Sequence, residues 1–334
     1  GMDFAWRDEK VESYRNFANK IWNATRFCLM NSEGANIDQA LISDADSVAA
    51  GSIADRWIIS KLNRTAREVN DALDKYAFHV AVDLLYHFFW DDFCDWYIEL
   101  SKDDITGGDA ESSSRIITIL EQALRLLHPF MPYLTEELWQ KLPGTDARLH
   151  NPAYRNADPT IMLADFPVGD ANLIDEQAES DMQTIIELIS KIRNIRAEMQ
   201  IKPSDPVIVH IASDSAVQRI FVENEAQIKK LARASKLVAG EKLEVPSASA
   251  KGVLSNGAEM AIPLEGLIDF EKERSRLKNQ INKLETEGEK LKQQLDNENF
   301  VNKAPAEKVE AVKDRVSEIE IQIRALSENL AAIK

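Results

Sequence analysis

One short segment holds the residues of this sequence best suited to acid–base or metal chemistry. Asp91, Asp92 and Asp95 lie within two turns of a predicted helix, and His87 precedes Asp91 by one turn. Carboxylates and an imidazole at this spacing could bind a metal ion or exchange protons, as in a hydrolase. They also fit the solvent edge of an aromatic helix, where each would be held by a hydrogen bond. We favour the second interpretation and predict no catalytic, cofactor-binding or metal-binding residues.

Other motifs of catalysis and metal binding are missing from the sequence. It has no Gly-rich phosphate loop and no Gly-x-Ser-x-Gly elbow. Its two cysteines, Cys28 and Cys94, form no Cys-x-x-Cys pair, which disfavours a zinc site or a disulfide framework. No apolar run reaches the ~18–20 residues of a membrane span. We therefore predict a cytoplasmic protein that does not enter a membrane.

The net charge of −16 argues at first against a nucleic-acid partner, because phosphate contacts require Lys and Arg. The charge is unevenly distributed, however. From Phe270 onwards basic and acidic residues are nearly balanced, so the preceding part carries the acidic excess. In residues 8–30, aromatic residues alternate with Lys, Arg and Asn, which fits either a core helix with a polar edge or a surface for a phosphate backbone.

Helices are predicted along most of the chain. They must position the acidic residues near Asp91 and the basic and aromatic residues of 8–30. After residues 8–30, the polar residues 31–51 are predicted to form a connector, and Asp55 is predicted to cap a helix that begins at Arg56. Further predicted helices span 78–101, 114–127, 132–142 and 175–200. The β-branched run 207–211 and short apolar runs near 237, 253 and 259–264 indicate strands of a small α+β module.

The last part of the chain has the apolar repeat of a coiled coil. Apolar residues and Gly288 recur at steps of three and four on two charged helices, which predicts two narrow seams. The seam positions are Leu277, Ile281, Leu284, Gly288, Leu291 and Leu295, followed by Val309, Val312, Val316, Ile319, Ile323, Leu326 and Leu330. Pro305 is suited to open the second helix, so the pair is predicted to form an antiparallel hairpin about 30 Å long.

Several segments together resemble valyl-tRNA synthetases. The run 14–27 (YRNFANKIWNATRF) is similar to the stretch after the family's catalytic core, and 54–63, 89–99, 127–139 and 192–199 are similar to its anticodon-binding bundle and the following helix. Most of these segments are shared in part with isoleucyl and leucyl relatives. The hairpin tip 299–305 (NFVNKAP) is more specific, because it resembles the C-terminal arm of the valyl enzymes.

The resemblance implies the C-terminal part of a ligase that joins valine to its tRNA with ATP and Mg²⁺. The family's signatures resembling His-Ile-Gly-His and Lys-Met-Ser-Lys-Ser, which stabilise the phosphates of ATP, are absent here. We therefore expect this part to be inactive by itself and to bind no cofactor. Its expected partners are tRNA-Val and the catalytic and editing domains of the same chain, in a monomer.

The predicted fold class is mainly α, with an anticodon-binding helical bundle, a small α+β module and a C-terminal antiparallel coiled-coil hairpin. We predict a connector helix over 1–31, the bundle over 32–169, a linker helix and the α+β module over 170–265, and the tRNA-binding arm over 266–334.

Two sets of residues are predicted to contact tRNA. Unpaired anticodon bases are read by stacking and by hydrogen bonds to their edges. The candidates on the anticodon side are Arg15, Asn16, Lys20, Asn23, Arg26, Arg56, Trp57, Lys61 and Arg64, although Trp57 also fits a core position. On the arm, contacts to the shape and phosphates of the outer corner of tRNA are predicted for Arg274, Arg276, Lys278, Lys283, Phe300 and Lys303.

Two alternatives to this reading remain open. The chain could be a helical scaffold whose coiled coil pairs with another chain, or the corresponding region of an isoleucyl-type synthetase. The isoleucyl relatives commonly end in a cysteine-rich zinc module, which two isolated cysteines cannot form.

Overall fold

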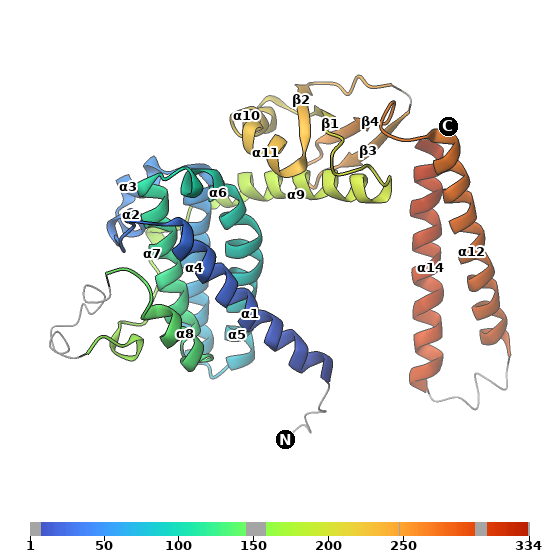
Figure 1. Ribbon diagram of the computed structural model, residues 1–334. Coiled ribbons are helices and arrows are strands. Elements are labelled where there is room, and N and C mark those ends of the chain that lie inside the picture. Colours follow the sequence, from blue (N-terminus) through green and yellow to red (C-terminus); the bar gives the residue numbers. More distant parts are fainter. Residues whose placement is uncertain (1–7, 145–157, 247, 298–305, 333–334) are drawn as a thin grey trace. The chain divides into compact units, whose positions relative to one another are not determined.

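The computed structural model describes residues 8–144, 158–246, 248–297 and 306–332 (Figure 1). The chain divides into two compact units, Gly1–Gln183 and Thr184–Lys334, which we call the helical unit and the arm unit. Helices dominate and the strands form one four-stranded sheet, so the predicted fold class is confirmed. Within the described ranges, no helix is long and apolar enough to cross a membrane.

The helical unit is a bundle of helices around the almost fully buried helix α7. Thirteen of the 18 residues of α7 (Ala110–Leu127) are buried, which places this helix at the centre of the packing. The helices around it are α1 (Asp8–Asn31), α4 (Ile53–Asp74), α5 (Phe78–His87), α6 (Ile98–Thr106) and α8 (Pro132–Trp139). Short 3-10 turns at Ile161–Leu163 and Ala171–Leu173 lead to α9 (Glu176–Glu198).

The predicted cap of α4 is wrong. The predicted connector 31–51 includes two short helices, α2 (Ala40–Ser43) and α3 (Ala45–Ala50), and ends just before this cap. The N-cap of α4 is Ser52 rather than Asp55, and the two side chains form a capping box. Asp55 is therefore the third helical residue, and its carboxylate accepts hydrogen bonds from Ser52 and also reaches into the bundle.

The buried carboxylate of Asp55 joins three helical segments. Asp55 Oδ1 accepts a hydrogen bond of 2.7 Å from the Tyr97 hydroxyl, and Oδ2 accepts one of 3.3 Å from Arg115 Nη1. Arg115 lies on α7 and also pairs with Glu111. Burial, followed by the charge of Asp55, raises the pKa of Tyr97 well above its usual value. The hydroxyl thus stays protonated and donates to the carboxylate.

The predicted aromatic helix is one continuous helical segment with a change of winding in its middle. Between α5 and α6, residues Phe88–Tyr97 form a π-helix, and the backbone N–H of Ile98 bonds to the carbonyl of Phe93. The wider turns shift the register relative to an α-helix. Phe88, Phe89, Phe93 and Tyr97 are nonetheless nearly inaccessible and form the aromatic part of the core.

The arm unit begins with the later turns of α9 and a mixed sheet. Its strand order is β2-β1-β4-β3, with β1 (Val207–Ala212) parallel to β2 (Ala234–Gly240) and antiparallel to β4 (Glu259–Pro263). Strand β3 (Ser249–Val253) pairs antiparallel with β4. Helices α10 (Ser215–Glu223) and α11 (Glu225–Ala232) connect β1 to β2.

The predicted coiled-coil hairpin consists of α12 (Phe270–Asp296) and α14 (Ala306–Ala332), which lie side by side (Figure 1). Every predicted seam position is buried or half-buried, while most positions between them are exposed. Gly288 is a seam position where a Cβ atom would lie 3.3 Å from Ile319 Cγ2. Ile319 is only 1% exposed, so the glycine provides the space that this side chain fills. The tip 299–305 lies outside the described residues.

Candidate nucleic-acid interface

Four of the predicted anticodon-side residues are exposed on α1. Arg15, Asn16, Asn23 and Arg26 recur at helical spacing, so they share a broad outer face of this helix. Arg15 pairs with the equally exposed Glu12 at 3.2 Å, an arrangement that water screens strongly. Trp22, which is 43% exposed, lies among them. This face combines cations, amide groups and an aromatic ring, the side chains that bind unpaired bases.

The predicted cations of α4 instead lie in ion pairs within the helical unit. Arg56 is 3.4 Å from Asp175, Lys61 is 3.2 Å from Asp92, and Arg64 is 3.1 Å from Glu179. All three cationic side chains are about one-third exposed, and their carboxylate partners come from the π-helix or from the region where α9 begins. These pairs hold neighbouring helical segments together and offset the charges of the cations.

Lys20 and Trp57 also serve the packing of the bundle. The Lys20 ammonium pairs with Asp95 and lies 5.0 Å from the centre of the Trp90 ring, so α1 is joined to the π-helix by an ion pair and a cation–π contact. Trp57 is 3% exposed and belongs to the core. In this conformation its ring has no free face on which a base could stack.

The acidic cluster considered for acid–base chemistry is divided among different partners. Asp95 pairs with Lys20, Asp92 with Lys61, and Asp91 with His87 at 2.6 Å. Burial raises the pKa of Asp92 to about 6, although the nearby Lys61 charge opposes the shift. Within the described part of the chain, no three His, Cys, Asp or Glu residues form a group that could hold a metal ion. The π-helix therefore uses these carboxylates to contact its neighbours.

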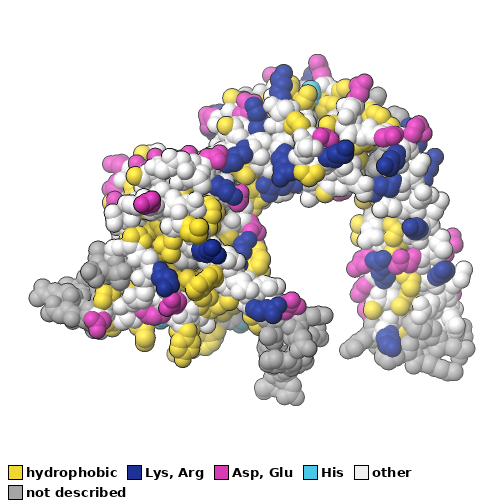
Figure 2. Space-filling view, in the orientation of Figure 1, with side chains coloured by type: hydrophobic (Ala, Val, Ile, Leu, Met, Phe, Trp, Pro, Cys, Tyr) yellow, Lys and Arg dark blue, Asp and Glu magenta, His cyan; other side chains and the backbone are white. Residues whose placement is uncertain are grey.

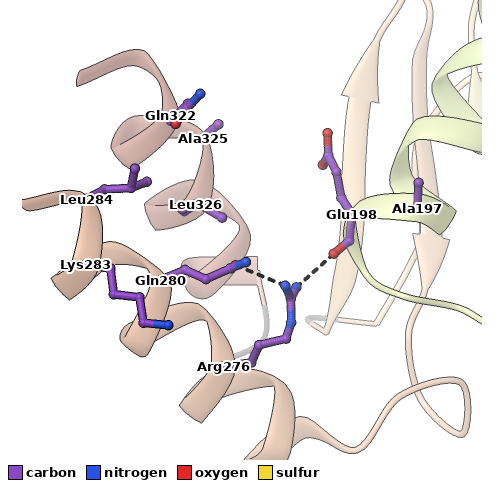
Figure 3. Close-up of a pocket in the computed structure, with 9 residues that line it drawn as sticks. All are labelled: Ala197, Glu198, Arg276, Gln280, Lys283, Leu284, Gln322, Ala325 and Leu326. Atoms are coloured by element: carbon purple, nitrogen blue, oxygen red, sulfur yellow. Dashed lines mark hydrogen bonds between the residues drawn. The ribbon is translucent and has the colours of Figure 1, made fainter. Parts of the chain in front are cut away.

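The predicted cations of the arm lie on the first half of α12. Lys278 and Lys283 are exposed, and Arg274 pairs with Glu271 at 2.6 Å. Arg276 bonds to the side-chain oxygen of Gln280 at 3.0 Å and to the backbone carbonyl of Glu198 at 2.9 Å (Figure 3). The base of the arm is thus attached to the end of α9. The other two arm candidates, Phe300 and Lys303, lie outside the described residues.

A pocket of about 540 Å³ opens between the end of α9 and the arm. Its polar lining comes from Arg276, Gln280 and Lys283 on α12 and from Gln322 on α14 (Figure 3). Leu284 and Leu326 of the seam form part of its apolar wall. Glu198 also lines the pocket, so its walls combine cations, a carboxylate, amides and apolar carbons, which suits a polar ligand better than a small apolar one.

Two families of known proteins match parts of the chain. The family described as "Anticodon-binding domain of tRNA ligase" matches residues 55–211, which run from the start of α4 through β1. The family described as "Valyl tRNA synthetase tRNA binding arm" matches residues 269–334, which include the coiled-coil hairpin. The chain matches the C-terminal part of valyl-tRNA synthetases.

Valyl-tRNA synthetases from several bacteria are similar along nearly the whole chain. The valine–tRNA ligase of Geobacter sulfurreducens is 42% identical over 96% of this chain, and that of Thermotoga maritima is 38% identical over 95%. The valine–tRNA ligase of Bacillus subtilis is 37% identical over 100% of this chain. These matches cover 35%, 34% and 36% of the relatives, so the chain spans about a third of their length. The predicted resemblance to the C-terminal part of a valyl-tRNA synthetase is thereby confirmed.

Proposed function

We propose that this chain holds tRNA-Val for a valine–tRNA ligase. The observation that carries the proposal is the coiled-coil hairpin at residues 269–334, which matches the tRNA-binding arm of valyl-tRNA synthetases. Attachment of valine, with ATP and Mg²⁺, would take place in catalytic and editing domains of the same polypeptide. The complete ligase would act as a cytoplasmic monomer.

The anticodon-side contact is best supported on α1. Arg15, Asn16, Asn23 and Arg26 are exposed and lie beside the accessible ring of Trp22. We assign the stacking and hydrogen bonding of unpaired bases to this face. Arg56, Lys61, Arg64 and Lys20 would act as positioning residues, because their ion pairs fix the helices on which the contacting residues lie.

The arm is proposed to contact the outer corner of the folded tRNA through shape and phosphate groups. Arg274 and Lys278 lie on one side of α12, Arg276 and Lys283 lie on the opposite side beside the pocket, and Phe300 and Lys303 belong to the predicted tip. Contacts of this kind position an RNA without reading its sequence. The arm should therefore add affinity for many tRNAs, whereas discrimination between anticodons should depend on the helical unit.

The test is binding of the whole chain to tRNA-Val and to a tRNA with a different anticodon, over a series of salt concentrations. The proposal predicts tighter binding of tRNA-Val and a steady loss of affinity as salt rises. The double variant Arg15→Gln/Arg26→Gln should reduce the preference for tRNA-Val. A matched control, Lys313→Gln/Lys308→Gln on α14, should keep that preference. Equal binding of both tRNAs by the unaltered chain would contradict anticodon reading.

The scaffold alternative makes a different prediction for the same protein. A coiled coil that pairs with another copy would give a mass that rises with protein concentration and no dependence on RNA. Sedimentation of the chain with and without tRNA distinguishes the two functions. A mass that stays constant until tRNA is added supports the tRNA-holding function.

A further inference from the structure

Three arginines gather in the arm unit where α9, the following loop and β2 meet. Arg193 and Arg196 lie one helical turn apart on α9, and Arg233 is the residue between α11 and β2. Arg233 has a left-handed backbone conformation (φ 52°), which turns the chain sharply from the helix into the strand. The three side chains line a pocket of about 400 Å³. None of them was among the predicted contact residues.

Backbone carbonyl groups orient these guanidinium groups. Arg196 is 7% exposed, and its Nη1 and Nη2 atoms donate hydrogen bonds of 2.9 Å to the carbonyls of Asp205 and Lys202. Arg233 Nη1 donates to the carbonyl of Pro203 at 3.2 Å, and Arg193 Nε to that of Leu231 at 3.0 Å. The carbonyls bonded to Arg196 and Arg233 fix the directions of these two guanidinium groups but carry no net charge.

Arg196 lies close to a second cation, Arg233. Burial and the neighbouring charge of Arg233 lower the pKa of Arg196, and the opposing influence of Asp205 is weaker. Two cations are thus held close together in a partly dehydrated place. Since guanidinium groups remain charged at neutral pH, an anion that entered the pocket would relieve their repulsion.

The pocket is continuous with the base of the arm. It shares Ala197 with the pocket in Figure 3, where Arg276 and Lys283 lie. A third pocket contains Arg276 together with Lys272 and with Lys202 from the loop after α9. Figure 2 shows Lys and Arg side chains along the exposed side of α9. The cations therefore recur from the start of β2 to the first turns of α12, with Glu198, Asp205 and Asp269 as the acidic residues among them.

We propose that Arg233 and Lys202, supported by Arg193 and the buried Arg196, bind the phosphate backbone of the RNA whose outer corner contacts the arm. The proposal rests on the proposed function and adds a second contact surface outside the coiled coil. A guanidinium group presents parallel N–H donors that match two phosphate oxygens. Arg196, whose Nη atoms already donate to the carbonyls of Asp205, Arg233 and Lys202, is a buried positioning residue. The exposed Arg233 and Lys202 supply the phosphate contacts at the rim of the site.

This chemistry predicts a contact that is indifferent to nucleotide sequence. The residues of the surface reach phosphates, and no exposed aromatic ring that could stack on a base lines this pocket in the described part of the chain. Loss of a phosphate contact weakens the binding of all RNAs similarly. It also reduces the slope of log affinity against log salt by about one for each contact. The anticodon preference assigned to α1 should not change.

The experiment uses the whole chain and compares two double variants that each remove two positive charges. Arg233→Gln/Lys202→Gln neutralises the rim of the site, and Lys242→Gln/Lys251→Gln neutralises exposed lysines at the far end of β2 and on β3. Arg196 stays unaltered, because its hydrogen bonds hold the loop. Affinity for tRNA-Val and for a second tRNA is measured over a salt series, and thermal unfolding checks that each variant is folded.

The rim variant should bind both tRNAs about tenfold more weakly, with a salt slope smaller by about two. The control should remain within about twofold of the unaltered chain. Equal affinities for the rim variant and the unaltered chain, or equal losses in both variants, would overturn the inference while leaving the proposed function intact. Absence of tRNA binding by the unaltered chain would overturn both. If the double variant unfolds, the single variant Arg233→Gln repeats the test. Its salt slope should be smaller than that of the unaltered chain by about one.

Discussion

The cations of α4 in the helical unit and the arginines between α9 and β2 in the arm unit have different kinds of partner. In the helical unit, cations on α1 and α4 face carboxylates of the π-helix and of the region around the start of α9, as in the Lys61–Asp92 and Arg64–Glu179 pairs. In the arm unit, Arg196 and Arg233 are oriented by neutral carbonyl groups. The ion pairs around α4 offset the charges of the cations inside the fold. The carbonyl groups around Arg196 and Arg233 do not, so these charges can attract an external anion. Surface basicity in the sequence therefore does not by itself identify a phosphate-binding residue.

The largest expected effect comes from removing a carboxylate inside the helical unit. Asp55→Ala leaves the Arg115 guanidinium, whose side chain is 4% exposed, without the carboxylate that offsets it across the bundle. Unpairing a buried charge typically costs about 3–5 kcal/mol. Urea unfolding followed by circular dichroism should show a loss of this size.

The matched control for Asp55 is another aspartate at a helix start. Asp109 caps α7 but is exposed, so Asp109→Ala should cost only about 1 kcal/mol. Equal losses in the two variants would mean that capping, rather than compensation of a buried charge, explains the importance of Asp55.

The next effect tests the apolar seam that holds the arm together. Gly288→Leu places a large side chain where Ile319 already fills the space, and overpacking of this kind costs about 1–3 kcal/mol. Hydrogen exchange of α12 and α14 should become faster around this position. Thr286→Leu, at an exposed position two residues away, should leave the exchange unchanged. Faster exchange in the control alone would contradict the predicted seam.

The Lys61–Asp92 pair offers a smaller effect that depends on pH. Because burial raises the pKa of Asp92 to about 6, the folded state binds more protons than the unfolded state between about pH 4 and pH 6. The contribution of Asp92 to stability should thus decrease as pH rises through this range. Lys61→Met removes the charge that opposes the shift, so the pKa measured by carbon NMR should increase further. A lower pKa in this variant would show that the ion pair does not form.

The smallest effect concerns a half-buried cation of α4. Arg64→Gln should lower stability by no more than about 1 kcal/mol, because the pair with Glu179 is partly accessible to water. Chemical denaturation measures this loss. A much larger loss would show that the ion pairs around α9 stabilise the helical unit more than their exposure suggests.

Periodic features of the fold could be predicted from the sequence, and features that depend on long-range contacts could not. The seam positions of α12 and α14 follow from a strict repeat, and β1 follows from its β-branched run. No comparable repeat in the sequence distinguishes the π-helix from an α-helix. Its wider turns become apparent only in the folded structure. Similarly, the sequence alone did not show that Ser52 rather than Asp55 is the N-cap of α4, because the partners of the Asp55 carboxylate, Tyr97 and Arg115, are distant in the chain.

The candidate surfaces show the same limit. Sequence spacing predicted tRNA contacts for Arg15 and Arg26, which are exposed. It predicted the same for Lys61 and Arg64, because their carboxylate partners are distant in the chain and could not be foreseen. Arg233 could not be associated with Arg196 because 36 residues, two helices and the strand β1 separate them. Their proximity arises only when β2 pairs with β1 beside α9.

The most direct test of the contrast between the two units is the salt dependence of tRNA-Val binding by two charge-matched double variants of the whole chain. Lys61→Gln/Arg64→Gln removes cations that are paired inside the helical unit, and Lys278→Gln/Lys283→Gln removes exposed cations of the arm. We predict an unchanged slope of log affinity against log salt for the first variant and a slope smaller by about two for the second. A reduced slope for the first variant and an unchanged slope for the second would contradict this account.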